Sequence, residues 1–359
     1  MISDFHFLRP MWLLALVAAA LLAWVVSRQE DMRTKWADVI APHLLDRLLL
    51  DRRGTQRIRP VHLTIVLLAL GAIAVTVPLA AQTNWDSVSI RTIPAGQGVH
   101  MLIGSGGNIA LAVGDEFAFL VDDQFEQLSA KILAAVRAAT DKPVRFLVNT
   151  HWHGDHSGGN ENMAKAGVII VAHDNVRTRM STDQFIEAFK SAVPASPRGA
   201  LPVVTFAESV TFHLGTETIH VIHVPPAHTD GDAIVHFTRA NTLHMGDTYF
   251  NGRYPFIDLS SGGSFEGVIG AVDAGLRYAN DSTKIIPGHG AMASRADLQM
   301  YRNVLAGVRD RVAALIKQGK TKEQVIAAKP SAEWDATWGS GFMKPDVFLA
   351  IVYESMKKK

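Results

Sequence analysis

The sequence predicts a mixed α/β domain that follows two membrane-spanning helices. Two uncharged apolar runs lie in the first 82 residues, whereas from residue 88 short apolar runs alternate with glycine-rich turns and amphipathic stretches. The chain has 359 residues, enough for one large domain or two ordinary ones. Its formal net charge is +1, so no strong electrostatic field favours nucleic acid as a partner. It has no cysteine, which excludes disulfides, thiolate ligands and a cysteine nucleophile.

The first 82 residues predict a membrane hairpin. Helices are expected at about 11–27 and 61–81, because both apolar runs approach the length that spans a bilayer. The intervening loop, 28–60, carries eight Lys and Arg residues, whereas the tail before it carries only Arg9. The positive-inside rule makes this loop cytoplasmic. We therefore expect an anchor in a bacterial inner membrane, with the remaining chain in the periplasm.

A second interpretation of the same segment is a secretory signal. The basic Arg57-Ile58-Arg59, the apolar run and the small residues of Leu79-Ala80-Ala81-Gln82 follow the order of a signal peptide, whose cleavage would release the domain into the periplasm. The stretches Phe5-His6-Phe7-Leu8-Arg9-Pro10 and Ile40-Ala41-Pro42-His43-Leu44-Leu45 instead resemble the N-terminal membrane hairpin of Bat-like von Willebrand factor A-domain proteins. Under that resemblance, residues 1–82 act as an anchor.

The rest of the chain predicts a catalytic domain over 83–318 and a helical C-terminal extension over 319–359. Short apolar runs predict strands at 99–103, 108–113, 117–121, 145–149, 168–171, 209–214, 217–224, 233–237, 243–245 and 284–286. Helical spacing of apolar residues predicts helices at 125–140, 160–166, 174–190, 264–279, 294–317, 321–328 and 347–356. Ser294 and Thr321 are placed to cap two of these helices.

The stretch 150–156, Thr-His-Trp-His-Gly-Asp-His, concentrates three histidines and one aspartate at the end of a predicted strand. Imidazole and carboxylate groups suit Zn²⁺, Fe and Mn²⁺. Three further candidate ligands, His228, Asp247 and His289, also follow predicted strands, where loops present side chains from a rigid scaffold. The sequence therefore predicts a metal site assembled from four places in the chain.

These motifs, in this order, resemble those of the metallo-β-lactamase superfamily over about residues 88–293. The resemblance implies an αββα sandwich and a site for two Zn²⁺ ions, with Fe or Mn possible. It implies that His151, His153 and His228 hold one metal, that Asp155, His156 and His289 hold the other, and that Asp247 bridges both. The implied reaction is hydrolysis of a small molecule, in which a metal-bridging hydroxide attacks an amide, lactam, lactone or ester. Asp155 would be the catalytic residue that orients this nucleophile.

The match departs from the lactamases at two positions. Many of them have cysteine or serine where Asp247 stands, and lactamases of the cysteine type have a lysine where this chain has Phe250. β-Lactam hydrolysis itself is therefore less expected than metal-dependent hydrolysis in general. The same loop supplies candidate substrate contacts in Tyr249, Arg253 and Tyr254. Asp122 and Asp232 are candidates to accept hydrogen bonds from the ligand histidines.

Two other classes of function are open at this stage. One is a mononuclear iron oxidoreductase of the same superfamily, and the other is a non-catalytic metal-binding module tethered to the membrane. The sequence predicts neither the substrate nor the oligomeric state.

Overall fold

The computed structural model describes residues 83–357. The predicted membrane hairpin and signal region lie outside these residues. Within the described part of the chain, no helix is both long and apolar enough to cross a membrane.

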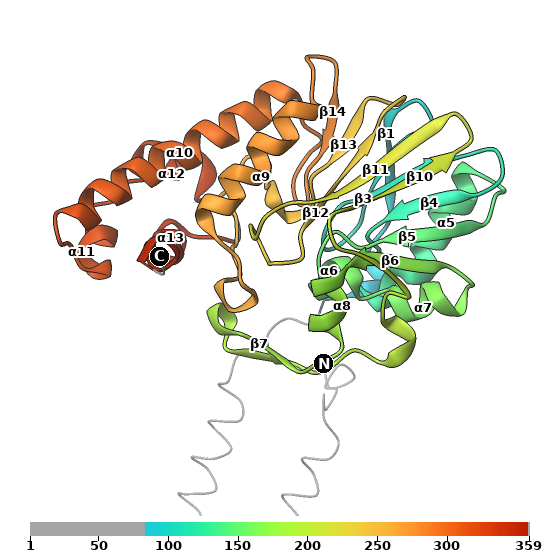
Figure 1. Cartoon of the computed structure of the whole chain (residues 1–359), viewed down its shortest axis with the longest axis horizontal. Helices are drawn as coiled ribbons and strands as arrows, with labels where there is room; N and C mark the ends of the chain where they lie inside the picture. The colour runs from blue at the N-terminus through green and yellow to red at the C-terminus, as the bar shows by residue number, and fades with distance from the viewer. Residues whose placement is uncertain (1–82, 358–359) are drawn as a thin grey trace, which may run out of the picture. The chain divides into compact units, whose positions relative to one another are not determined.

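Two packed sheets form the centre of the fold (Figure 1). In the first sheet, β1–β4 run antiparallel to their neighbours, and β4, β5, β6 and β9 run parallel. Its strands, in spatial order, are β1 (Arg91–Gly96), β2 (Val99–Ile103), β3 (Ile109–Val113), β4 (Ala118–Val121), β5 (Val144–Val148), β6 (Ile169–His173) and β9 (Val204–Phe206).

The second sheet follows the order of the sequence. Neighbouring strands are antiparallel except for the last pair, which is parallel. Its strands are β10 (Ser209–Leu214), β11 (Glu217–His223), β12 (Ala233–Phe237), β13 (Thr242–His244) and β14 (Lys284–Ile286). The β13–β14 connection contains a helix, as a parallel crossover requires.

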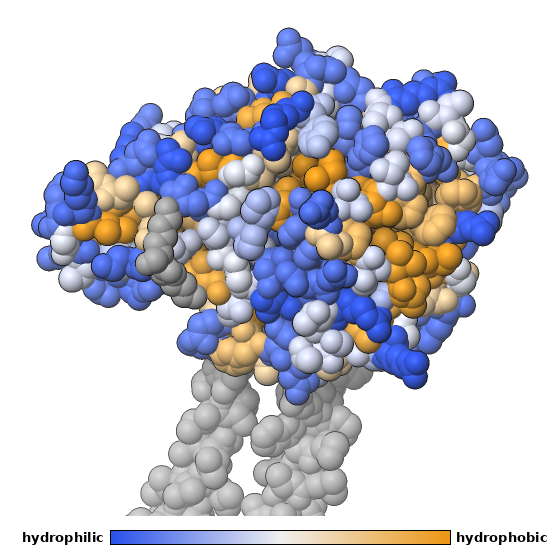
Figure 2. Space-filling model, in the orientation of Figure 1, coloured by the Kyte–Doolittle hydropathy of each residue, from blue (hydrophilic) through white to orange (hydrophobic). Residues whose placement is uncertain are grey.

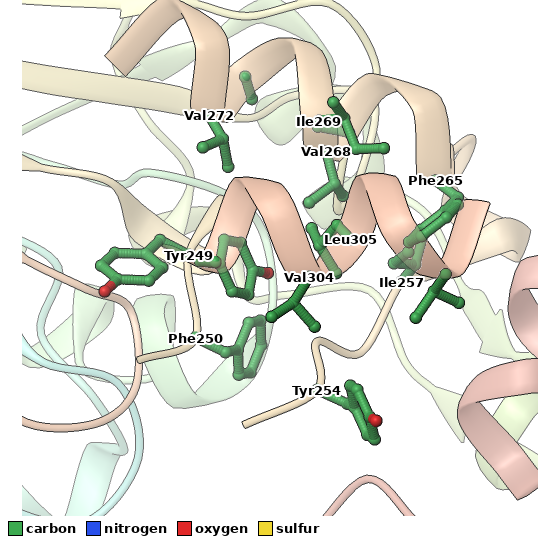
Figure 3. Close-up of a cluster of buried hydrophobic side chains, with 14 of the residues drawn as sticks. Tyr249, Phe250, Tyr254, Ile257, Phe265, Val268, Ile269, Val272, Val304 and Leu305 are labelled. Atoms are coloured by element: carbon green, nitrogen blue, oxygen red, sulfur yellow. The ribbon is translucent and has the colours of Figure 1, made fainter. Parts of the chain in front are cut away.

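Successive side chains of each strand point to opposite faces of its sheet, so the apolar core forms separate layers. Residues of one face of each sheet pack together between the sheets, where Phe119 lies 4.9 Å from Phe212, centroid to centroid. The other face of the first sheet packs against α5 (Ser129–Ala139) and α7 (Asn160–Lys165). The other face of the second sheet packs against α9 (Phe265–Tyr278) and α10 (Arg295–Lys317), as Figure 3 shows for part of this cluster. The predicted αββα order is therefore present.

The C-terminal helices belong to the same compact unit, Asn84–Lys359. They are α11 (Lys322–Ala327), α12 (Ala332–Trp338) and α13 (Pro345–Lys357), and their apolar residues join the core that α9 and α10 form. The ring of Phe348 stacks on Tyr254 at 4.3 Å. The predicted extension is thus packed onto the loop that follows β13.

The structure differs from the sequence prediction at several elements. The helix predicted at 174–190 is wrong beyond α8 (Asp174–Met180), because a hairpin of β7 (Gln184–Ile186) and β8 (Ser191–Val193) follows it. Lys190 adopts a left-handed φ of 50°, which ends helical geometry there. Strands β1 and β9 and helix α12 were not predicted. The short helix α6 (Gly154–Ser157) and the 3-10 turns η1 (Trp85–Ser87), η2 (Glu126–Leu128), η3 (Glu187–Phe189), η4 (Arg198–Ala200), η5 (Gly246–Thr248) and η6 (Leu259–Ser261) complete the elements.

Candidate metal centre

The seven predicted ligands meet at one edge of the sandwich. They lie just beyond β5, β13 and β14 and in the loop between β11 and β12. Their nitrogen and oxygen atoms form three overlapping groups, within each of which all atoms lie within 4.8 Å of one another. The groups are His151 with His153 and His228, His151 with His156 and Asp247, and Asp155 with His156 and His289.

Two glycines allow the chain to close tightly around this cluster. A Cβ on Gly107 would lie 2.1 Å from the ring of His156, and a Cβ on Gly288 would lie 2.1 Å from Oδ1 of Asp247. Both distances are far below van der Waals contact, so any side chain at either position would displace a ligand. The loop between β2 and β3, which the sequence marked only as a turn, therefore forms one wall of the site.

The hydrogen bonds of His153 and His228 fix their tautomers. Nδ1 of His228 is 2.8 Å from the carbonyl of Phe256, and Nε2 of His153 is 3.1 Å from Oδ2 of Asp258. Both oxygens can only accept, so these nitrogens carry the protons. The remaining nitrogens, Nε2 of His228 and Nδ1 of His153, face each other at 2.8 Å with their lone pairs. Such an arrangement is repulsive unless a cation lies between the two rings.

Asp122 orients the other two histidines of the motif. Its Oδ2 accepts hydrogen bonds from Nδ1 of His156 at 2.7 Å and from Oγ1 of Thr150 at 2.8 Å. Oγ1 of Thr150 then accepts from Nδ1 of His151 at 3.1 Å. Nε2 of His151, although buried, has no hydrogen-bond partner among the described residues. Asp122 occupies a left-handed backbone conformation with a φ of 64°, a strained geometry of the kind that functional sites retain.

Asp247 lies between the ligand groups. Its Oδ1 is 3.0 Å from Nε2 of His156, and its Oδ2 is 3.3 Å from Nε2 of His289, 3.5 Å from Nε2 of His228 and 3.9 Å from Nε2 of His151. Two ligands of a tetrahedral zinc ion, each ~2.0–2.1 Å from the metal, lie roughly 3.3 Å apart. The spacing, the lone pairs and the unpartnered Nε2 of His151 therefore fit divalent metal ions.

Burial and mutual charge perturb the pKa values of the metal-free cluster. Burial lowers the pKa of His151 well below its usual value and that of His228 to about 4, so both are neutral and ready to ligate. Burial opposes ionisation of Asp155, but His156 and His289 prevail and lower its pKa to about 2. Burial also opposes protonation of His289, but Asp247 and Asp155 raise its pKa to about 9. Without metal, protons thus partly neutralise the second group.

Asp258 contacts the site, although the sequence did not indicate it. Besides the bond from His153, its Oδ2 accepts a 2.5 Å bond from Oγ of Ser261, which in turn accepts from Nε1 of Trp152 at 3.2 Å. Burial opposes ionisation of Asp258, but hydrogen bonds from His153, Ser260 and Ser261 outweigh it and keep the pKa of Asp258 well below its usual value. No spacing rule links residue 258 to residue 153, so only the fold shows this pairing.

Asp232 supports the site through the backbone. Its carboxylate accepts from the amides of His228 at 2.6 Å and Thr229 at 2.9 Å, and from Oγ1 of Thr229 at 2.6 Å. Burial raises its pKa to about 7. Asp232 therefore bonds to the main chain of His228, whereas the imidazole of His228 bonds to the carbonyl of Phe256.

A cavity of about 450 Å³ opens beside Asp155, Asp247 and His289. Of the three predicted substrate contacts, Arg253 and Tyr254 line it, and Tyr249 does not. Tyr249 is fully buried and packs on Tyr301 at 4.9 Å in the cluster drawn in Figure 3. We therefore exclude Tyr249 from the proposed substrate contacts.

Two curated proteins are similar in sequence to part of this chain. A hydroxyacylglutathione hydrolase of Gloeobacter violaceus is 29% identical over 150 residues, covering 39% of this chain and 52% of the relative. A linear primary-alkylsulfatase of a Pseudomonas species is 23% identical over 237 residues, covering 55% and 45%. This chain spans about half the length of these curated relatives.

The structure of a stereoselective inverting sec-alkylsulfatase from a Pseudomonas species superposes with a TM-score of 0.57 at 17% identity. The match covers 74% of this chain and 50% of that one, and it supports the fold. Residues 96–298 match the family model described as "Metallo-beta-lactamase superfamily". This match covers more than half of the chain and contains all seven ligand residues, so the protein belongs to the metallo-β-lactamase superfamily.

Proposed function

We propose that the protein is a dinuclear zinc hydrolase that cleaves a carbonyl-type bond, such as an ester or lactone, in a small molecule. The observation that carries the proposal is the position of Asp247, whose two oxygens lie 3.0–3.5 Å from Nε2 of His228 in the first proposed ligand group and of His156 and His289 in the second. A carboxylate placed in this way supports a bridged pair of metals rather than a single iron ion. The names of both curated relatives support hydrolysis as the reaction class.

Two of the three ligand groups would each hold one metal. His151, His153 and His228 would hold the first, and Asp155, His156 and His289 the second, with Asp247 shared. Two such cations, when bound, supply a hydroxide nucleophile at neutral pH and polarise the bond under attack.

Asp155 is the proposed catalytic residue of the chain itself. Its side chain is partly exposed and lines the cavity, whereas the ligands His151 and His156 are buried. With a pKa of about 2 it is ionised at neutral pH, so a carboxylate oxygen can accept a hydrogen bond from the attacking water and aim it into the cavity.

Arg253 is the proposed contact for an anionic group of the substrate. It is the sole Lys or Arg among the residues that line the cavity, and its guanidinium forms no hydrogen bond or ion pair with any residue between 83 and 357. This observation also favours a second candidate activity, the hydrolysis of sulfate esters. Arg253→Gln should raise KM for anionic substrates about tenfold or more and leave KM for uncharged esters unchanged. Equal effects on both would remove Arg253 from substrate binding.

A combined metal and substrate experiment tests the proposed function. The purified full chain is expected to contain two zinc ions and to hydrolyse esters or lactones in a screen that also contains β-lactams, thioesters, alkyl sulfates and phosphodiesters. A double substitution, His151→Ala with Asp155→Ala, should abolish the activity. One iron per chain with oxygen uptake would support the oxidoreductase instead. Turnover of alkyl sulfates alone would select the second candidate, and turnover of phosphodiesters alone would contradict both.

A further inference from the structure

The cavity beside the metal centre has one wall made of aromatic rings. Phe256 begins this wall at the metal ligands, because its ring lies 5.6 Å from that of His228 and 6.0 Å from that of His153. Phe189, from the turn between β7 and β8, lies 4.7 Å from Phe256. Phe342, from the segment between α12 and α13, lies 5.6 Å from Phe189. We call Phe189, Phe256 and Phe342 the aromatic wall.

Two of these rings are exposed although packing partners are close. Phe342 has 67% and Phe189 44% of its surface accessible, whereas Phe256 is buried. Figure 2 shows hydrophobic surface over the β7–β8 hairpin that carries Phe189. Ile186, Val193 and Met343 add further apolar groups to the same cavity. Exposed apolar side chains that continue a cavity lining indicate a surface that a ligand covers.

The cavity is lined by few charged groups. The carboxylates that line it, Asp155 and Asp247, are both metal ligands, and the remaining charged residue is Arg253. Arg253 lies beside Gly341, which precedes Phe342 in the sequence. The reacting bond would therefore lie next to the metals, and an apolar part of the substrate would lie along the three rings. A short polar substrate would leave this wall in contact with water.

We propose that the aromatic wall binds an apolar chain or aryl group of the substrate, and that it sets the preference for long over short chains. This inference rests on the proposed hydrolase function for its kinetic test but not for its binding test. The chain would lie against Phe256 near the metals and along Phe189 and Phe342 at the mouth. Residues far apart in the sequence, from the hairpin and from the C-terminal segment, would thus determine specificity together.

Chain-length kinetics test the proposal. The zinc-loaded full chain should hydrolyse 4-nitrophenyl octanoate with a kcat/KM about tenfold or more above that for the acetate, since added methylenes in an apolar site raise selectivity by factors of this size. Phe189→Ala combined with Phe342→Ala should remove most of this ratio. Both side chains are exposed, so the substitutions should not prevent folding.

Phe185→Ala is the matched control. Phe185 lies on the same hairpin, is 49% exposed and does not line the cavity, so its loss should not change the ratio. An equal effect of Phe185→Ala would indicate a general hydrophobic surface, such as one that contacts a lipid bilayer, and would overturn the proposal. A flat chain-length profile in the unmodified protein would also overturn it.

A binding measurement separates this proposal from the proposed function. Calorimetric titration with decanoate and butanoate needs no turnover. Tighter binding of decanoate, lost in the double Phe variant and kept in Phe185→Ala, would support the aromatic wall even if none of the esters is hydrolysed. Equal binding of the two acids would overturn it even if the protein proves to be an esterase.

Discussion

At the scale of single residues, the hydrogen bonds outside the ligand set decide which nitrogen of each histidine faces the cluster. Asp258 and the carbonyl of Phe256 accept from one nitrogen of His153 and of His228, so the other nitrogens of these two rings face each other. Asp122 accepts from Nδ1 of His156, so Nε2 of His156 faces the cluster. Because a neutral imidazole has one lone pair, losing such an acceptor frees the ring to take the wrong tautomer. The geometry of the site therefore depends on the ligands and also on the hydrogen-bond acceptors that orient them.

Asp258→Ala should weaken zinc binding about 10- to 100-fold, the range seen when the acceptor behind a ligand histidine is lost. Competition with a chromogenic chelator measures this affinity. Asp281→Ala is the control, because Asp281 is exposed and lies outside the site. Zinc affinity equal to that of the unmodified chain would show that Asp258 only caps the η6 turn, whose amides it also binds.

Zinc binding should release protons and strengthen as pH rises toward 9. Acidic neighbours raise the pKa of His289 to about 9 and that of His156 well above its usual value in the metal-free protein, so both are protonated at pH 7. Metal and proton compete for the same nitrogens. For each proton that zinc must displace, the apparent affinity for zinc should fall about tenfold for every pH unit below the pKa of that histidine. Calorimetry at pH 7 in buffers of different ionisation enthalpy counts the protons. A count of zero would contradict the raised pKa values.

At the scale of secondary-structure elements, the sequence predicted those whose cause is local. The two helices with capping boxes begin where Ser294 and Thr321 indicated, because a cap acts over three residues. The ligand motif 150–156 could likewise be identified from the sequence, because metal binding restricts the type and the spacing of its residues. The β7–β8 hairpin was not predicted, because the periodicity of apolar residues indicates neither which strands pair nor that the hairpin packs against Phe256. Asp258 and Gly107 were missed for the same reason, as each acts on a residue distant in sequence.

Helix α13 should be essential to the stability of the whole domain. Phe348 is fully buried, stacks on Tyr254 and meets Phe265 at 5.9 Å. Phe348→Ala should lower the free energy of unfolding by about 3–5 kcal/mol, as for other large-to-small changes in a core. Urea denaturation measures the change, and Val347→Ala, one residue earlier and exposed, should cost less than about 0.5 kcal/mol. Similar losses for both would mean that α13 does not share the core.

At the scale of the whole molecule, we propose that the catalytic domain is exported from the cytoplasm. The domain belongs to the metallo-β-lactamase superfamily, and the apolar runs before it predict an anchor whose basic loop stays in the cytoplasm. Among the described residues, the C-terminal helices complete the core, and Phe342 and Met343, between α12 and α13, line the cavity. The proposed location concerns the delivery of substrate, whereas all seven predicted ligands lie within residues 83–357.

The absence of cysteine makes this topology directly testable. Single substitutions, Thr55→Cys in the predicted cytoplasmic loop and Asp281→Cys on the exposed surface of the domain, each introduce one thiol into a chain that has none. In bacterial cells with a permeabilised outer membrane, a membrane-impermeant maleimide should label Asp281→Cys at once and Thr55→Cys only after lysis. The reverse pattern would place the domain in the cytoplasm. Labelled protein that is soluble and about 82 residues short would favour signal cleavage over an anchor.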